Sequence, residues 1–336
     1  MEFNHDNILK QYLGEVNYKV RSGKGGMNNT TLFVETATGK FVLRIYRTHK
    51  DIDKVNYEHH ILCRLGTMGL PFGTPVPVHS SDGETVRFTE DGKPAALFQF
   101  MEGDTPDFSK PEQLESFGVT AGRLSEALRA VKSELQPVYR PYYDLENAHP
   151  RCPISQVISF CKQPGPEFEG HSAELLIAAA ELEKFKKSRA GFDRLPHQLV
   201  HGDLNASNVL ADKEGNISAV LDFEFVTEDL RVMELCVCLS ELINIKDAEE
   251  MLWKRLEAFI KGFAGTGMVT KQEAEVIPVL IMLRRLDVFI HFLGRHWDGV
   301  DKPDVVADQL HNLAIQAKWL DENSMRLITL INKIIK

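Results

Sequence analysis

The character of the chain changes near residue 102, and this change restricts the folds that it can adopt. Before that point, runs of β-branched and aromatic residues alternate with glycine-bearing turns, at 18–21, 30–36, 41–46, 84–89 and 95–101. Such runs between turns predict strands and hairpins. One stretch, 51–65, instead repeats apolar residues at helical spacing. Beyond residue 106 the pattern is mainly helical, so the sequence predicts an α+β fold with a β-rich part first and a helical part second.

This division predicts three segments. We expect an N-terminal lobe over residues 1–101, a hinge linker over 102–106 and a larger helical lobe over 107–336. The main helices of the last segment are predicted at 114–131, at 172–189 and over most of the chain after 230, with strand-like pieces between 199 and 225. A chain of 336 residues is long enough to give each lobe a core.

Charge and composition exclude several classes of partner. The net charge of −9 argues against nucleic acid as the main partner, although a single nucleotide needs only a local site. The apolar run 279–283 is far shorter than the roughly 20 residues of a membrane-spanning helix. The five cysteines have scattered spacings, so we expect reduced thiols in a cytoplasmic protein.

The residues that carry chemistry lie in one compact stretch. His201 to Leu210 reads HGDLNASNVL, which has the form H-G-D-x-x-x-x-N, and a short apolar strand then ends in Asp222-Phe223-Glu224. The transition state of phosphoryl transfer spreads charge over the transferred oxygens, so a protein must supply positioning and metal ions. The spacing of the polar residues in these two motifs suits phosphoryl transfer.

Each polar residue of the stretch has a distinct expected role. Asp203 is placed to receive or orient the proton of an acceptor hydroxyl, and Asn208 and Asp222 offer the oxygen ligands that Mg²⁺ prefers. The same spacing occurs in the catalytic loop and the metal-binding motif of protein kinases. The alternative is a set of ordinary polar loop residues, and the second motif at hairpin-compatible separation argues against it.

HGDLNASNVL followed by VLDFEF resembles the aminoglycoside phosphotransferase and choline kinase superfamily. The length and N-terminal layout are most similar to its type II homoserine kinase branch. The resemblance covers nearly the whole chain but is specific mainly at these two motifs. It implies a bilobal, protein-kinase-like fold that binds ATP with Mg²⁺ between the lobes and phosphorylates a small-molecule alcohol. It also implies that the backbone of the linker, at Gln99 and Met101, meets the adenine edge.

Several positions depart from the protein-kinase pattern. Arg44 occupies the place of the phosphate-binding lysine, where it keeps the charge but offers a planar fork. Glu58 on the following helix is placed to pair with Arg44, and the alternative for both is a solvent-facing position. Glu224 replaces the glycine of Asp-Phe-Gly, and we expect it to assist the metal or the substrate. Glu234 stands where the superfamily often has an aspartate that braces the catalytic loop.

A glycine-rich turn, 23–29, lies between the first two expected strands. Glycines allow backbone N–H groups to approach phosphate oxygens, so Gly25, Gly26 and Asn28 are expected to cover the phosphates. The alternative is a plain hairpin turn. The turn is not a Walker A motif, because no Lys-Ser/Thr pair opens a helix.

A late helix, 281–295, combines apolar faces with one polar stripe made by Arg284, Asp287, His291 and Arg295. A mainly buried helix must satisfy such groups somewhere. Either the stripe lines the acceptor pocket, or Asp287 forms an internal salt bridge with an arginine. If it lines the pocket, Arg284, His291 and Arg295 favour an acceptor with a carboxylate or another anion.

The sequence therefore predicts an ATP- and Mg²⁺-dependent small-molecule kinase whose acceptor is homoserine or a similar amino alcohol. A sugar such as an N-acetylhexosamine or an antibiotic is the alternative acceptor. A protein substrate is disfavoured because no Ala-Pro-Glu segment follows Asp222. A nucleotide-binding pseudokinase module is the rival from another class, and the presence of Asp203, Asn208 and Asp222 argues against it. The sequence leaves open the identity of the acceptor, the pathway, the preference between ATP and GTP, and the oligomeric state.

Overall fold

The computed structural model describes residues 5–23, 29–46, 51–243 and 248–335, which form two compact units. The first unit comprises Met1–Pro106, Ala130–Tyr139 and Ala206–Val226, and the second comprises Asp107–Arg129, Arg140–Asn205 and Thr227–Lys336. The segment 206–226, which carries Asn208 and Asp222, thus belongs to the same unit as the β-rich part. The lobe and hinge boundaries at 101 and 106 stay predictions.

The first unit is built on an antiparallel sheet with the strand order β1-β2-β3-β5-β4. Its strands are β1 Tyr18–Ser22, β2 Asn29–Thr36, β3 Lys40–Tyr46, β4 Arg87–Phe88 and β5 Pro94–Gln99. The strand expected over 84–89 is shorter than predicted because Glu84 closes a turn, in which its carbonyl accepts the N–H and the hydroxyl of Ser80.

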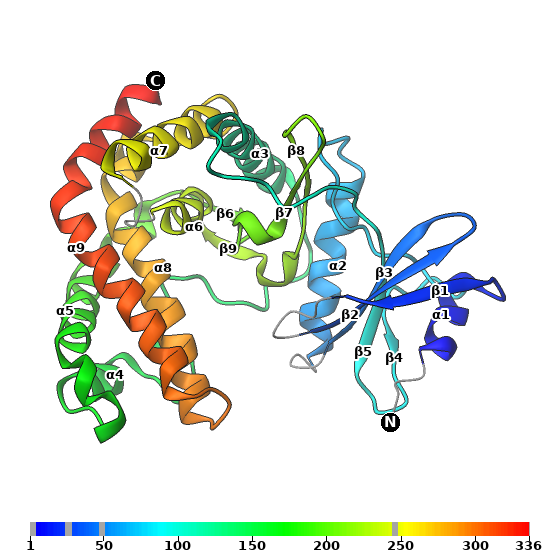
Figure 1. Ribbon diagram of the computed structural model, residues 1–336, viewed down its shortest axis with the longest axis horizontal. Helices are drawn as coiled ribbons and strands as arrows, with labels where there is room; N and C mark the ends of the chain where they lie inside the picture. The colour runs from blue at the N-terminus through cyan, green and yellow to red at the C-terminus, as the bar shows by residue number, and fades with distance from the viewer. Residues whose placement is uncertain (1–4, 24–28, 47–50, 244–247, 336) are drawn as a thin grey trace. The chain divides into compact units, whose positions relative to one another are not determined.

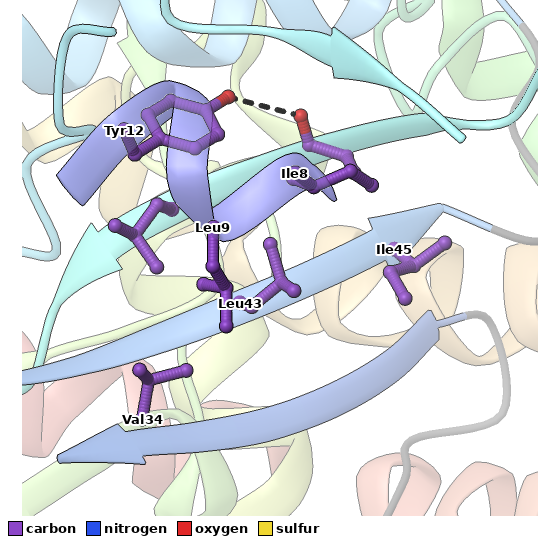
Figure 2. Close-up of a cluster of buried hydrophobic side chains, with 8 residues drawn as sticks. Ile8, Leu9, Tyr12, Val34, Leu43 and Ile45 are labelled. Carbon is purple, nitrogen blue, oxygen red and sulfur yellow. Dashed lines mark hydrogen bonds between the residues drawn. The ribbon is translucent and has the colours of Figure 1, made fainter. Parts of the chain in front are cut away.

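One face of this sheet carries the core of the first unit. Helix α1, Asp6–Leu13, lies on that face and buries Ile8 and Leu9 against the strands (Figure 2). Leu43 and Ile45 of β3 point into the same core. Side chains alternate along a strand, so Arg44 between them points to the opposite face of the sheet.

Helix α2, Ile52–Gly66, begins at Asp51, whose side chain accepts the N–H of Asp53 at 3.1 Å. Strands β7, Val209–Ala211, and β8, Ile217–Val220, form a hairpin in the same unit. The N–H of Gly73 donates to the carbonyl of Ser218 at 2.8 Å, and the N–H of Val220 donates back to Gly73 at 3.0 Å. These bonds fix the hairpin to the segment that follows α2.

The second unit is helical around a two-stranded antiparallel ribbon (Figure 1). Its helices are α3 Pro111–Ala130, α4 Ile154–Lys162, α5 Ser172–Ser188, α6 Met233–Leu242, α7 Glu249–Ala264, α8 Lys271–Trp297 and α9 Pro303–Ile334, and its strands are β6 His197–Val200 and β9 Thr227–Leu230. Short 3₁₀ turns occur in the chain at Leu145–Asn147, Pro166–His171, Arg189–Arg194, Ala206–Asn208 and Phe223–Phe225. Helices α8 and α9 lie side by side, and residues 233–240 of α6 are buried.

Helix α8 is anchored at its first turn by a buried ion pair. Arg231, which follows β9, donates from Nε and Nη2 to the two carboxylate oxygens of Glu273 at 3.1 and 2.6 Å. Glu273 also closes a capping box with Thr270. A two-pronged arginine–carboxylate pair fixes direction as well as distance, so α8 is held firmly relative to the ribbon.

None of the helices that the structure describes is long and apolar enough to cross a bilayer. The five cysteines are all free thiols, and Cys236 and Cys238 of α6 are both fully buried. A cytoplasmic location stays a prediction.

Candidate active site

On the face of the sheet opposite α1, Arg44 joins two acidic residues of the first unit. Its Nη1 lies 3.1 Å from Glu58 Oε1 and 3.3 Å from Asp222 Oδ1. The Arg44 side chain is 17% exposed and that of Glu58 is 3% exposed, which excludes solvent-facing positions for both. Burial raises the pKa of Glu58, and the adjacent guanidinium opposes that rise. The expected pairing of Arg44 with Glu58 is thus present.

Tyr46 also belongs to this network, and the sequence reasoning missed it. Its hydroxyl donates to Glu58 Oε2 at 3.1 Å, while Glu58 Oε1 faces Arg44. The guanidinium of Arg44 lies 5.4 Å from the centre of the Phe98 ring, which limits its movement. Tyr46 is two residues after Arg44 on one strand, so the two side chains share a face, and this spacing could have revealed it.

Asp222 has a left-handed backbone conformation. Its φ of 62° and ψ of 68° make it the one non-glycine residue with positive φ in the described ranges. Aspartate tolerates the left-handed region better than most residues, yet the conformation still costs about 1–3 kcal/mol. The carbonyl of Asn208 accepts the N–H of Leu221 at 2.8 Å, which brings Asn208 beside Asp222.

The residues of this region suit a hard cation. Asp222 Oδ1 is buried and faces the Arg44 guanidinium at 3.3 Å, but it accepts no well-aligned hydrogen bond from any residue within the described ranges. Together with the side-chain oxygen of Asn208, it offers the ligand type that Mg²⁺ prefers. No group of three or more His, Cys, Asp or Glu residues in the described chain could hold a metal alone. That is compatible with Mg²⁺, which commonly uses one or two protein carboxylates with water and substrate phosphates.

Glu224 is tied to the start of β2. Its Oε2 accepts a hydrogen bond from Asn29 Nδ2 at 3.1 Å, and its side chain is buried. Asn29 Oδ1 is buried and lacks a hydrogen-bond partner among the residues described. The predicted phosphate-covering residues Gly25, Gly26 and Asn28 lie outside the described residues.

A cavity of about 260 Å³ opens at one end of the same sheet. It is lined by Lys19, Arg21, Phe33, Val34, Glu35, Lys40, Phe41 and Phe100. Phe33 and Phe100 meet edge to face with their ring centres 5.8 Å apart. Gln99 and Met101 flank Phe100 in the sequence without lining the cavity, and the N–H of Gln99 already donates to Val76. The N–H of Gln99 is therefore already bonded, and a role of the Gln99 and Met101 backbone at an adenine edge stays a prediction.

In the second unit, Asp203 follows β6 directly and is held by α8. Arg284 Nη2 donates to Asp203 Oδ1 at 2.6 Å, and the two side chains are 14% and 22% exposed. Gly202 has a φ of 81°, which favours glycine, and the N–H of Asp203 donates to His201 Nδ1 at 3.2 Å. The loop thereby presents the Asp203 carboxylate in one orientation.

Glu234 braces this loop in the way that the sequence suggested. The N–H of His201 donates to Glu234 Oε2 at 2.7 Å, and Glu234 is completely buried. Burial raises the pKa of Glu234 to about 7, and the hydrogen bond from the His201 N–H opposes this rise.

Tyr142 and Asp229 complete the support, and the sequence reasoning missed both. The hydroxyl of Tyr142 donates to the carbonyl of Gly202, and its N–H donates to Asp229 Oδ2 at 2.6 Å. Burial raises the pKa of Asp229 to about 7, while its bonds with the N–H groups of Tyr142 and Leu230 oppose the rise. Only folding reveals these contacts, because Tyr142 and Asp229 lie 87 positions apart.

The polar stripe of α8 is divided between two environments. Arg284 packs over the Tyr142 ring at 5.4 Å, and its Nη1 lies 3.9 Å from Asp287 Oδ2. Arg295 instead donates from Nε and Nη2 to Asp301, at 2.6 and 3.1 Å, and His291 is exposed. Both arginines therefore already face a carboxylate, which weakens the expectation that the stripe recognises an anionic acceptor.

The sequence matches the model of the phosphotransferase enzyme family over residues 19–262. A homoserine kinase of Polaromonas naphthalenivorans is 24% identical over 291 residues, 83% of this chain and 82% of that protein. An amicoumacin kinase, solved with AMP-PNP and Ca²⁺, has a TM-score of 0.70 at 15% identity and covers 94% of each chain. A microcompartment-associated aminopropanol kinase has a TM-score of 0.68 at 16% identity, over 96% of this chain and 97% of that one.

The two structural likenesses confirm the predicted α+β, protein-kinase-like fold. The family match and the homoserine kinase relative confirm the superfamily that the motifs around Asp203 and Asp222 indicated. The chain therefore belongs to the phosphotransferase enzyme family and is a small-molecule kinase whose acceptor is an alcohol.

Proposed function

We propose that the protein transfers the γ-phosphoryl group of ATP, with Mg²⁺, to the hydroxyl of homoserine or a similar amino alcohol. The observation that carries the proposal is the state of Asp222. Its buried Oδ1 faces only the Arg44 guanidinium, at 3.3 Å, and lacks a hydrogen bond from the described residues. Its backbone is left-handed, and Asn208 lies beside it. A strained backbone and a buried carboxylate oxygen without a hydrogen bond at one residue are typical of a ligand-binding position.

The first unit supplies the groups that would bind the nucleotide. Arg44 offers its guanidinium fork to phosphate oxygens, and Glu58 and Tyr46 hold that fork in place. The cavity beside Phe33 and Phe100 has aromatic walls that suit a purine ring. Roles for Gly25, Gly26 and Asn28 in covering the phosphates, and for the backbone of Gln99 and Met101 at the adenine edge, stay predictions.

Asn208 and Asp222 would hold Mg²⁺, with Glu224 assisting. When bound, the ion neutralises charge that develops on the phosphoryl oxygens. Asp203 orients the acceptor hydroxyl and takes its proton as the new bond forms. Arg284 fixes the carboxylate through Oδ1, and Glu234 and Tyr142 fix the loop that carries it.

Two observations support an amino alcohol as acceptor. Two curated relatives that match over about four fifths of the chain are homoserine kinases, and one similar structure is an aminopropanol kinase. The pseudokinase alternative is disfavoured because the supports of Asp203 are intact, which a pure binding module does not need.

The test is ADP release with Mg·ATP against homoserine, aminopropanol, choline, an N-acetylhexosamine and an aminoglycoside. We expect release with an amino alcohol, and a fall of about 10²–10⁴-fold in the Asp203→Asn variant, because that change removes the group that takes the proton. Asp308→Asn, at an exposed position of α9, is the matched control and should leave the rate unchanged. Undiminished turnover by Asp203→Asn would remove Asp203 from the mechanism, and silence with the amino alcohols would contradict the proposed acceptor.

A further inference from the structure

Asp287 is a half-buried carboxylate whose one ion pair in the described part of the chain is a long one. Its side chain is 27% exposed, and Arg284 Nη1 lies 3.9 Å from its Oδ2, beyond the range of a hydrogen bond. The carboxylate of Asp287 accepts no hydrogen bond from the residues that the structure describes. Burying a charge is costly unless the group is paired and hydrogen-bonded, so this carboxylate has capacity for a further partner.

The charge of Arg284 is already shared. Its Nη2 is bound to Asp203 at 2.6 Å, while the contact with Asp287 is more than an ångström longer. Asp203 and Asp287 thus bring two negative charges to one guanidinium. The other acid packed near Tyr142 is Asp229, whose described hydrogen bonds come from backbone N–H groups and not from a cation. The group of Asp203, Arg284 and Asp287 therefore contains two carboxylates and one guanidinium.

A second feature of this set is an unused donor. Arg284 Nε is buried and donates to no atom in the described ranges. A buried N–H without an acceptor costs about 1–3 kcal/mol, and such groups normally have a partner when the site is complete. An oxygen atom of a bound molecule would satisfy it. The Asp287 carboxylate can thus accept a bond from a further cation, and Arg284 Nε can donate one to an oxygen atom.

The nearest positive side chains further along α8 do not supply the missing cation. Arg295 is bound to Asp301 by two hydrogen bonds, and His291 is exposed and pairs with no carboxylate in the ion pairs of the described residues. Arg285, next to Arg284 in sequence, pairs instead with Glu241 at 3.3 Å and with Gln316 at 2.9 Å.

We propose that Asp287 is the subsite for the protonated amine of the acceptor, and that it makes amine-bearing alcohols the preferred substrates. This inference rests on the proposed function, because Asp203 on the same guanidinium is the residue that meets the acceptor hydroxyl. A short amino alcohol carries its ammonium group only a few carbons from that hydroxyl, so both groups can reach the Asp203–Arg284–Asp287 set. The subsite replaces the earlier expectation of an anion at the polar stripe.

The test uses matched pairs of alcohols that differ only in the amine: homoserine with its des-amino counterpart, and aminopropanol with propanol. We expect the wild-type kcat/KM to favour the amine-bearing member by about ten- to hundredfold, the range for a hydrogen bond to a charged group. In Asp287→Asn the preference should fall to within about threefold. The KM for ATP should stay unchanged.

Two further variants distinguish a role of the Asp287 charge in binding the amine from a role of Asp287 in folding. Asp287→Glu keeps the carboxylate and should retain a preference for the amine, whereas a purely structural role predicts no such rescue. Glu275→Gln removes an exposed carboxylate from the same helix and should behave as the wild type. Turnover without amine preference in the wild type, or a preference that survives Asp287→Asn, would overturn the subsite while leaving the kinase intact. Silence with every amine-bearing alcohol would contradict the proposed acceptor and the subsite together.

Discussion

Tyr46 and Tyr18 both donate a hydroxyl to a carboxylate, one in the core and one at the surface. Tyr46 bonds the buried Glu58 at 3.1 Å, and Tyr18 bonds the exposed Asp6 at 2.8 Å. We expect Tyr46→Phe to lower the free energy of unfolding by about 1–3 kcal/mol, because Glu58 Oε2 then lies buried without that donor. Tyr18→Phe should cost less than about 0.5 kcal/mol, since water can replace the lost bond. Urea unfolding measures both, and equal effects would contradict the buried network around Arg44.

Glu234 makes stability depend on pH. Burial raises its folded-state pKa to about 7, whereas an unfolded glutamate titrates near about 4.3. Its stabilising contribution is therefore full below about pH 4, declines as pH rises, and is lost once pH passes about 7. Asp229 acts in the same direction, because burial raises its pKa to about 7 as well.

Glu234→Gln should reduce this pH dependence. The amide keeps an acceptor for the His201 N–H but cannot ionise, so the loss of unfolding free energy between pH 5 and 8 should shrink by about 1–3 kcal/mol. Glu228→Gln, at an exposed position of β9, serves as the control. The measurement is urea unfolding at both pH values, and identical pH dependence in wild type and Glu234→Gln would show that Glu234 is not the group responsible.

At the scale of elements, α3 and α7 approach each other through glycines. A Cβ at Gly118 would lie 2.1 Å from the carbonyl oxygen of Phe259, and one at Gly262 would lie 2.1 Å from that of Glu115. We expect Gly118→Ala to destabilise the protein by about 1–3 kcal/mol, because the two backbones must separate. Gly191→Ala, which meets nothing within 4 Å, is the control. Thermal unfolding compares them, and a neutral Gly118→Ala would contradict this close packing.

The elements that the sequence predicted are those with a strong local pattern. Residues 30–36 and 41–46 have β-branched and aromatic runs around a turn, and they form β2 and β3 within a residue of the expected bounds. Helices α1 and α4 were missed because they have only 8 and 9 residues. A short apolar run such as 154–161 does not distinguish a helix from a strand.

The candidate site shows the same division. Asp203, Asn208 and Asp222 could be proposed from the sequence because they fall in short local motifs whose spacing is typical of phosphoryl transfer. The bond between Arg284 and Asp203 joins residues 81 positions apart, and no local pattern encodes it. The polar stripe of α8 singled out Arg284 and Asp287 in the sequence. Their ion-pair partners could be identified only in the structure.

At the scale of the whole molecule, the fold and the family agree on the reaction class. The family match spans 19–262 and so includes residues of both compact units. The groups proposed for the nucleotide lie in the first unit, and Asp203 with its supports lies in the second.

The most direct test is to identify the product by mass spectrometry after incubating the protein with Mg·ATP and homoserine, and separately with aminopropanol. We expect one of these alcohols to gain a phosphoryl group at the rate of ADP release, and the amount of product to fall by about 10²–10⁴-fold with Asp203→Asn. ADP release without a phosphorylated alcohol, or equal product from Asp203→Asn, would contradict the account.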